Sequence, residues 1–538
     1  MTHSLSAPRA RPKRHKHVEE PIYTEMKPVN INTACDSPVA VPVSTTGSEQ
    51  PHDEATFSNG SASQATMMGN QEQTSGPPLS GLESLPAEVR IHVLCNMSNL
   101  QTLGALLHAS PIYYAQYRYN RKVILAQVIH SDLGDELFTD VYAAFRSRAS
   151  KIGPRKGPNV NVTDFLSLYR AWRSPGGERP TPDMCSLDDL RWMACFHTSI
   201  VRPLVSRFVA RALARKPGPS SVSSSDSASF LQSDIGDREL SGTESTRLLR
   251  ALYRLETFCH LFGGSQYQSS AFMGQVFSPV FFSDFDPWEV EEICCVHDLV
   301  KDRYEKIVAE VRWEFDEKNP KFADDLSFEP QGSFAIERDY DGTPACPPAS
   351  HLRGSAVHPL ILYGRSADLT LSSTTEFLNG TIGRGGLRLA LHMFTTETHN
   401  DLVALMEKSL STIQHHFFTE ASSMMAQWNR RDMARLRGLT DNRECIEQRR
   451  EALTFVGDDS AQPPLAWVLL WGGKYSNLYG EYVPVELRRR GYVMWDEGRL
   501  DVKAAREYFA RLWAESPELK EVKEDWPHMC DVFPPGSL

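Results

Sequence analysis

The chain has 538 residues, of which 41% are hydrophobic and 10% aromatic, so it can bury a substantial core. Its formal net charge of −11 argues against a polyanion-binding surface along the whole chain, so we expect no nucleic-acid partner. No stretch approaches the roughly 18 apolar residues of a membrane span, and the N-terminus lacks the apolar segment of a secretory signal, so we expect no membrane partner.

The cysteines predict an intracellular protein. The ten cysteines are scattered, and the adjacent pair Cys294-Cys295 cannot form a disulfide within one helix without distortion. Reduced thiols are typical of the cytoplasm and nucleus, so we expect one of these compartments. The basic residues between Arg9 and Lys16 are a candidate nuclear signal, with a solvated basic tail as the alternative.

Two segments are predicted to lack a fixed structure. In residues 1–80, Ser, Thr, Pro, Gly, Gln and Asn dominate and apolar residues follow no sustained period, so we expect a disordered tail. The Ser-rich residues 217–237 are predicted to form a disordered insertion in the body of the protein. The sequence leaves two roles open for this insertion, a phosphorylation site and a passive loop.

Residues 81–130 are predicted to form three short helices packed as a small bundle. The first begins at Leu85-Pro86, because proline is favoured in the first turn of a helix. Ser98-Asn99 separates it from the second, and Ser110-Pro111 begins the third. Each helix is too short to be stable alone, so all three must pack together. Their apolar positions are Leu85, Val89, Val93, Leu94, Leu100, Leu103, Leu106 and Leu107.

These apolar positions, with Ala109-Ser110 before the third helix, resemble an F-box, and the stretch is similar to F-box-like proteins of filamentous fungi. Tyr117–Arg121 stand where the family usually has a tryptophan. The resemblance implies that this module binds the Skp adaptor of a ubiquitin ligase and, through the adaptor, a cullin. The adaptor-binding residues that it implies are Leu85, Pro86, Val89, Val93, Leu94, Leu100, Leu103 and Leu107.

The predicted fold class is mainly α: a three-helix F-box-like module follows the disordered tail, and residues 131–538 form a large all-helical body. The apolar segment 465–471 is either a short helix or a buried strand, and Leu487–Asp496 is predicted to be a packing element. Other helices are expected over 135–151, 163–173, 186–215 with a kink near Pro203, 244–262, 286–315, 367–378, 386–410, 421–437 and 502–513.

Patterns that could support catalysis are weak, so we expect no enzyme activity. Cys294, Cys295 and His297 fall on one helix at spacings that point in different directions, which favours buried thiols over a catalytic dyad. The turn Gly383–Gly386 lacks the lysine of a phosphate-binding loop, so it favours the start of a helix over an anion site.

Candidate metal ligands are also incomplete, so we expect neither a metal nor a cofactor. His416 and Glu420 are spaced as two ligands on a helix, but nothing completes the set. Asp339–Gly342 resembles the start of a calcium loop, but Ser350 occupies the position of the glutamate that such a loop requires.

The sequence supports two functional hypotheses. The first is a substrate-recognition subunit of a Skp–cullin–F-box ubiquitin ligase, whose body binds an unknown protein substrate through aromatic segments near Phe281 and Tyr479. The second is a helical scaffold or regulatory protein with a vestigial module that does not bind the adaptor. The exposure of Leu85 and Val89 distinguishes them, because a docking module keeps these residues accessible and a vestigial one buries them.

Overall fold

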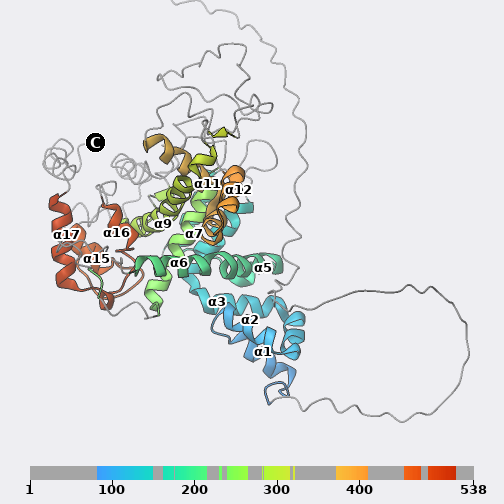
Figure 1. The fold of residues 1–538 in the computed structure, drawn as a ribbon. Helices are drawn as coiled ribbons and strands as arrows, with labels where there is room; N and C mark the ends of the chain where they lie inside the picture. The colour runs from blue at the N-terminus through green and yellow to red at the C-terminus, as the bar shows by residue number, and fades with distance from the viewer. Residues whose placement is uncertain are drawn as a thin grey trace, which may run out of the picture. The chain divides into compact units, whose positions relative to one another are not determined.

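The computed structural model describes residues 81–149, 162–174, 176–214, 230–232, 239–263, 281–282, 284–315, 319–320, 371–409, 453–473 and 483–515. These residues belong to one unit, which spans Pro77–Leu538 (Figure 1). Within the described residues the regular structure is helical, apart from one isolated β-bridge between Leu231 and Leu500. The predicted tail and the basic cluster from Arg9 to Lys16 lie outside the described residues.

The N-terminal helices are α1 (Ala87–Cys95), α2 (Leu100–Ala109) and α3 (Pro111–Ala149), and both α1 and α2 pack on α3. The Asn99 side chain begins α2 by accepting the backbone N–H of Thr102 at 2.8 Å. The third predicted helix and the helix predicted over 135–151 are two halves of α3. They join at Gly134, whose φ of 66° interrupts the helical backbone.

The next helices are α4 (Val162–Arg173), α5 (Leu187–Phe196), a π-helical turn (His197–Val201) and α6 (Arg202–Ala212). A capping box begins α5, in which the Ser186 hydroxyl accepts the Asp189 N–H and the Asp189 carboxylate accepts the Ser186 N–H. Near Pro203, where a break or kink is predicted, the helix changes to a π-helical turn that ends at Val201, two residues before this proline.

Helices α7 (Gly242–Phe262) and α9 (Pro287–Val311) form the centre of the fold, and α3, α9 and α11 all pack on α7 (Figure 1). Both helices agree with the predicted ones at 244–262 and 286–315. Each begins with a capping box, from Ser241 and Asp286 respectively, which satisfies backbone N–H groups of the first turn. Almost every side chain of α7 is buried, so neighbours surround it on all sides.

The remaining described helices are α11 (Leu371–Thr395), α12 (His399–Ser409), α15 (Leu465–Trp471), α16 (Val485–Arg489) and α17 (Val502–Glu515). Two boundary predictions are wrong here: the helix predicted to end at 378 continues in α11, and the one predicted over 386–410 is divided between α11 and α12. The segment 465–471 is a helix, which closes at Gly472 in the left-handed conformation. The predicted helix 421–437 lies outside the described residues.

The prediction that residues 217–237 are disordered is wrong at residues 230–232. The Phe230 carbonyl accepts the N–H of Asp501 at 3.0 Å, and the Gln232 N–H donates to the Arg499 carbonyl at 3.1 Å. The Phe230 ring is fully buried and packs against Phe509 of α17. An apolar Phe-Leu pair among serines was the only local sign of this contact. The other residues of the insertion lie outside the described residues.

The core contains paired charges as well as apolar side chains. The Arg250 guanidinium of α7 donates two hydrogen bonds of 2.6 Å to the Glu292 carboxylate of α9. Arg254, one turn further along α7, lies 3.0 Å from Glu289 and 3.1 Å from Asp140 of α3. Burial alone would lower the pKa of Arg250, but Glu292 and Glu289 outweigh it and raise the pKa. These arginines therefore remain cations inside the fold.

Similar pairs hold the predicted packing element 487–496 against the central helices. Tyr492 and Trp495 of this element are fully buried, as predicted, and the Trp495 indole N–H donates to the Arg490 carbonyl at 2.7 Å. The ion pairs that join this region to α7 and α9 are Arg488 with Glu291 at 2.8 Å, Arg499 with Glu244 at 2.6 Å, and Arg247 with Asp496 at 2.8 Å.

Removing the carboxylate of a buried pair should destabilise the fold far more than removing one at the surface. We expect Glu292→Gln to lower the free energy of unfolding by about 3 kcal/mol, because Arg250 loses the carboxylate that accepts two of its hydrogen bonds and keeps only Glu289, at 3.5 Å, as a nearby anion. Glu305→Gln, in the i,i+4 pair between the exposed Glu305 and the half-buried Lys301, should lower it by at most about 0.5 kcal/mol. Urea unfolding followed by circular dichroism measures both, and equal effects would contradict the prediction.

The turn Gly383–Gly386 begins the second half of α11, as predicted, and it holds a carboxylate of the chain itself. The Glu256 side chain accepts the backbone N–H of Leu387 at 2.7 Å. Gly386 has a φ of 55°, and a Cβ atom at this position would lie 2.5 Å from Glu256 Oε2. Glycine is therefore required here both by the backbone conformation and by the adjacent carboxylate.

Two glycine substitutions should separate these two requirements. Gly134→Ala is expected to lower the free energy of unfolding by about 1–3 kcal/mol through backbone strain alone, because no atom lies within 4 Å of the added Cβ. Gly386→Ala has a similar positive φ and must also displace Glu256, so its midpoint of urea unfolding should fall further. A Gly386→Ala variant no less stable than Gly134→Ala would disprove the role of the carboxylate.

Candidate protein-binding surface

The segment before α1 is fixed by polar contacts with two helices. Arg90 of α1 reaches back and donates to the carbonyls of Glu83 at 3.2 Å and Leu85 at 2.9 Å. The Ser110 hydroxyl, at the start of α3, donates to the Glu83 carboxylate at 2.6 Å. These hydrogen bonds therefore fix the backbone conformation of Leu85-Pro86 directly before α1. The sequence pattern located Leu85-Pro86 but not the residues that hold them.

The eight predicted adaptor-binding residues divide into two groups. Leu94, Leu100 and Leu103 are buried and hold α1 and α2 on α3, so in this conformation they offer no surface to a partner. Pro86 and Val89 are exposed, whereas Leu85, Val93 and Leu107 are half-buried. The surface available to a partner is thus smaller than expected, and adaptor contact through the remaining five residues stays a prediction.

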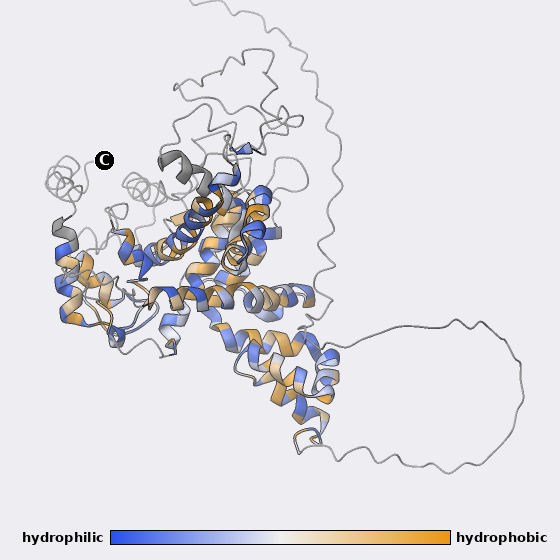
Figure 2. Cartoon of the chain, viewed as in Figure 1, coloured by the Kyte–Doolittle hydropathy of each residue, from blue (hydrophilic) through white to orange (hydrophobic). Residues whose placement is uncertain are grey.

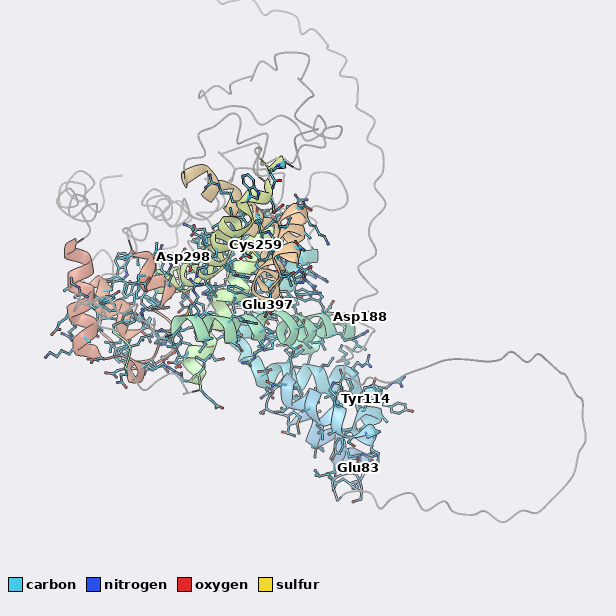
Figure 3. All side chains as sticks on the ribbon, in the orientation of Figure 1. Glu83, Tyr114, Asp188, Cys259, Asp298 and Glu397 are labelled. Carbon is cyan, nitrogen blue, oxygen red and sulfur yellow. The ribbon has the colours of Figure 1, made fainter. Side chains whose placement is uncertain are left out.

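The N-terminal helices carry a concentration of exposed apolar side chains. Among the described residues, five of the ten large hydrophobic side chains that are exposed lie between residues 82 and 123. They are Leu82, Val89, Tyr114, Tyr119 and Val123. Figure 2 shows hydrophobic and hydrophilic residues mixed along α1, α2 and the first half of α3. Tyr114 lies in this part of the fold, as does Glu83, which precedes α1 (Figure 3). Contiguous exposed apolar surface is typical of sites that bind another protein, and α1 and α3, which carry four of these five residues, pack on each other.

The buried carboxylate of Asp132 connects these helices to the rest of the fold. One of its oxygens accepts the Leu100 N–H at the start of α2 at 3.0 Å, and the other accepts a hydrogen bond from Arg202 of α6 at 2.8 Å. Arg202 also donates to His197 Nε2 at 2.9 Å, and His197 Nδ1 lies 2.7 Å from the Tyr253 hydroxyl of α7. The chain of contacts thus runs from α2 to α7.

No local pattern in the sequence marks Asp132, Arg202 or His197. The contacts join residues that are 32, 70 and 56 positions apart, so they exist only once the helices have packed. The π-helical turn, which contains His197, is the one local irregularity at this position.

His197 is held in its neutral form. Because Arg202 donates to Nε2, this nitrogen carries no proton, so Nδ1–H donates to the Tyr253 hydroxyl. Burial lowers the pKa of His197 to about 4, although the nearby Asp132 carboxylate acts in the opposite direction. A proton on Nε2 would break the contact with Arg202 and bring two cations together.

The other candidate sites do not form an accessible site in the described residues. Cys294, Cys295 and His297 are buried, and burial raises the pKa of both thiols well above its usual value, as expected for structural cysteines. Phe281 itself is fully buried and packs on Phe258, so its ring offers no surface to a partner, whereas residues 264–280 of the expected partner-binding segment lie outside the described residues.

Three further candidates lie outside the described residues. They are the metal-ligand pair His416 and Glu420, the calcium-loop candidate Asp339–Gly342, and the aromatic segment near Tyr479. Within the part of the chain that is described, no group of three or more His, Cys, Asp or Glu side chains could hold a metal ion. No described helix is long and apolar enough to cross a membrane.

No protein-family model, curated protein or solved structure matches this chain. Function is therefore inferred from the residues of this chain alone.

The neutral state of His197 predicts a loss of stability in mild acid. The unfolded chain takes up the proton near pH 6.5 and the folded chain only near pH 4, so stability is complete above pH 6.5 and falls below it. At pH 5 this difference amounts to roughly 2 kcal/mol.

Urea unfolding of the wild type and of His197→Asn at pH 7 and pH 5 measures this effect. The variant should lose roughly 2 kcal/mol less than the wild type over this interval. His92→Asn, which removes an exposed histidine of α1, is the control and should behave as the wild type does. If His197→Asn shows the same loss as the wild type, His197 is not the titrating group.

Proposed function

We propose that this protein is the substrate-recognition subunit of a Skp–cullin–F-box ubiquitin ligase. The observation that carries the proposal is the exposure of Val89, 40% of which is accessible, beside the exposed Pro86. These two residues belong to the motif that resembles an F-box, and a module without a partner would gain stability by covering them. The exposed apolar side chains of α1 and α3 support the same conclusion.

In this proposal, binding takes place on the outer face of the N-terminal helices. The adaptor covers Leu85, Pro86 and Val89, and each apolar side chain that becomes fully buried contributes about 1.5–3 kcal/mol. Arg90 and Glu83 hold the Leu85-Pro86 turn in place before the adaptor arrives, so little conformational entropy is lost on binding. The buried leucines of α1 and α2 keep the module folded.

The body then holds a protein substrate for the ligase, and the cullin is reached through the adaptor. The chain performs no chemistry in this role, since a receptor acts by raising the local concentration of the substrate near the transferring enzyme. Asp132 connects α2 to α6 and α7 through Arg202 and His197, which supports a fixed position of the module on the body.

The alternative is a helical scaffold whose module no longer binds the adaptor. The substitution of the usual tryptophan by Tyr117–Arg121 and the partial burial of Leu85 favour it. The accessibility of Val89 favours the receptor, because a vestigial module would bury this face.

A charge placed at Val89 should abolish adaptor binding. Val89→Asp puts a carboxylate on the apolar surface, where it must lose its hydration when the adaptor docks, so we expect affinity for purified Skp adaptor to fall at least about tenfold. Val485→Asp is the matched control, since this valine lies at the start of α16 and is 46% exposed. Isothermal titration of the full chain measures both.

Binding by the wild type and Val485→Asp but not by Val89→Asp supports the receptor. If the folded wild type does not bind the adaptor, the receptor is excluded and the scaffold remains. If both variants bind as the wild type does, the adaptor uses a surface other than α1.

A further inference from the structure

Six basic side chains gather on one face formed by α3, the start of α5 and α11. Five are exposed and Arg121 is half-buried, although the whole chain has a net charge of −11. We call this surface the cationic face. Its residues are Arg121, Lys122, Arg146, Arg148, Arg191 and Arg388.

Helix α3 packs on α5 and on residues 182–184, and Arg148 of α3 stacks on Trp192 of α5 at 4.4 Å, which brings these cations to one side of the fold. Their electrostatic effects on shared neighbours agree with this placement. The pKa of Arg148 is lowered by burial and then by Arg388, so the two guanidinium groups repel each other. Burial raises the pKa of the Cys185 thiol to about 11, whereas Lys122 and Arg146 both act to lower it. A surface that holds like charges side by side gains energy when an anion binds.

Aromatic rings fix the position of half of these cations. A guanidinium over a ring loses little freedom on binding and keeps N–H groups at its edge, which can donate in pairs to a carboxylate. The three stacked pairs are Arg148 over Trp192 at 4.4 Å, Arg121 over Tyr117 at 5.3 Å, and Arg146 over Tyr142 at 5.9 Å.

Carboxylates on the same face limit the kind of anion that fits. Asp183 and Asp188 are exposed beside the cations, and Asp188 lies 3.5 Å from Arg191. The half-buried carboxylate of Asp189 also acts on Arg148, whose pKa it raises against the effect of burial. A nucleic-acid backbone carries a charge on every phosphate, so it would be repelled at these positions. An acidic protein segment avoids this repulsion, because uncharged residues can separate its carboxylates.

We infer that the cationic face binds an acidic segment of a partner protein whose carboxylates are separated by uncharged residues. The inference deepens the proposed function, since it gives the chemistry of the protein that the body binds. Only one part of the inference, that this partner is a substrate of the ligase, rests on the proposed function. Peptide binding is measured without the adaptor, so its failure and the failure of adaptor binding are distinct results.

The probe is a fluorescein-labelled 16-residue peptide of Gly and Ser with six spaced Glu residues, titrated with the full chain in 50 mM and 200 mM NaCl by fluorescence anisotropy. We expect the peptide to bind and the affinity to fall at the higher salt concentration. An oligouridylate of equal charge should bind at least about tenfold more weakly, because its phosphates meet Asp183 and Asp188.

Charge reversal on the cationic face should weaken peptide binding at least about tenfold in Arg146→Glu/Arg148→Glu. The control is Lys503→Glu/Arg506→Glu, which makes the same change in net charge at exposed positions of α17, far from α5 in Figure 1. It should change the affinity less than about twofold. If loss of Arg148 from Trp192 unfolds the first variant, Arg146→Glu/Arg388→Glu replaces it, since Arg388 belongs to no stacked pair named above.

Three results would overturn the inference. The first is a wild-type protein that does not bind the peptide in 50 mM NaCl. The second is an equal effect of the face variant and the α17 control, which would assign binding to net charge or to another surface. The third is an oligouridylate that binds as tightly as the peptide or more tightly, which would make the face a nucleic-acid site.

Discussion

The arginines that α7 buries determine where the neighbouring helices must lie. Arg250 requires the carboxylate of Glu292 in α9, and Arg254 requires Asp140 in α3 as well as Glu289. An apolar contact tolerates a small shift between helices, but a buried cation that loses its partner destabilises the fold by several kcal/mol. The paired charges therefore specify one arrangement of α3, α7 and α9, and apolar packing fills the space around them.

The position of the N-terminal module follows from this arrangement, because α3 belongs to both parts. Its second half packs on α7 through Asp140, whereas α1 and α2 pack on α3 before the change of direction at Gly134. Asp132 then connects the start of α2 to Arg202, next to that change of direction. The core thus constrains the surface around Val89 although Val89 itself is exposed.

The two proposed binding surfaces differ in chemistry and both use α3. Around Val89 the surface is apolar, so it suits an adaptor that buries hydrophobic side chains. Around Arg148 and Trp192 it is cationic and rigid, so it suits carboxylates. The two surfaces meet on the first half of α3, where Arg121 and Lys122 lie between the exposed Tyr119 and Val123. Their centres are further apart, since Val89 lies on α1 and Arg148 lies near the end of α3.

The sequence by itself determined most of the helices, since their signals are local, although it misplaced the boundaries of α11 and α12. Ser186 and Asp286 marked helix starts because a capping side chain acts on N–H groups within three residues. Only the tertiary structure decided which side chains are available to a partner. Arg250 meets a carboxylate 42 positions away, Leu94 is covered by α3, and Phe230 is buried against α17. Periodicity shows which residues share a helix face, but not which neighbour covers that face.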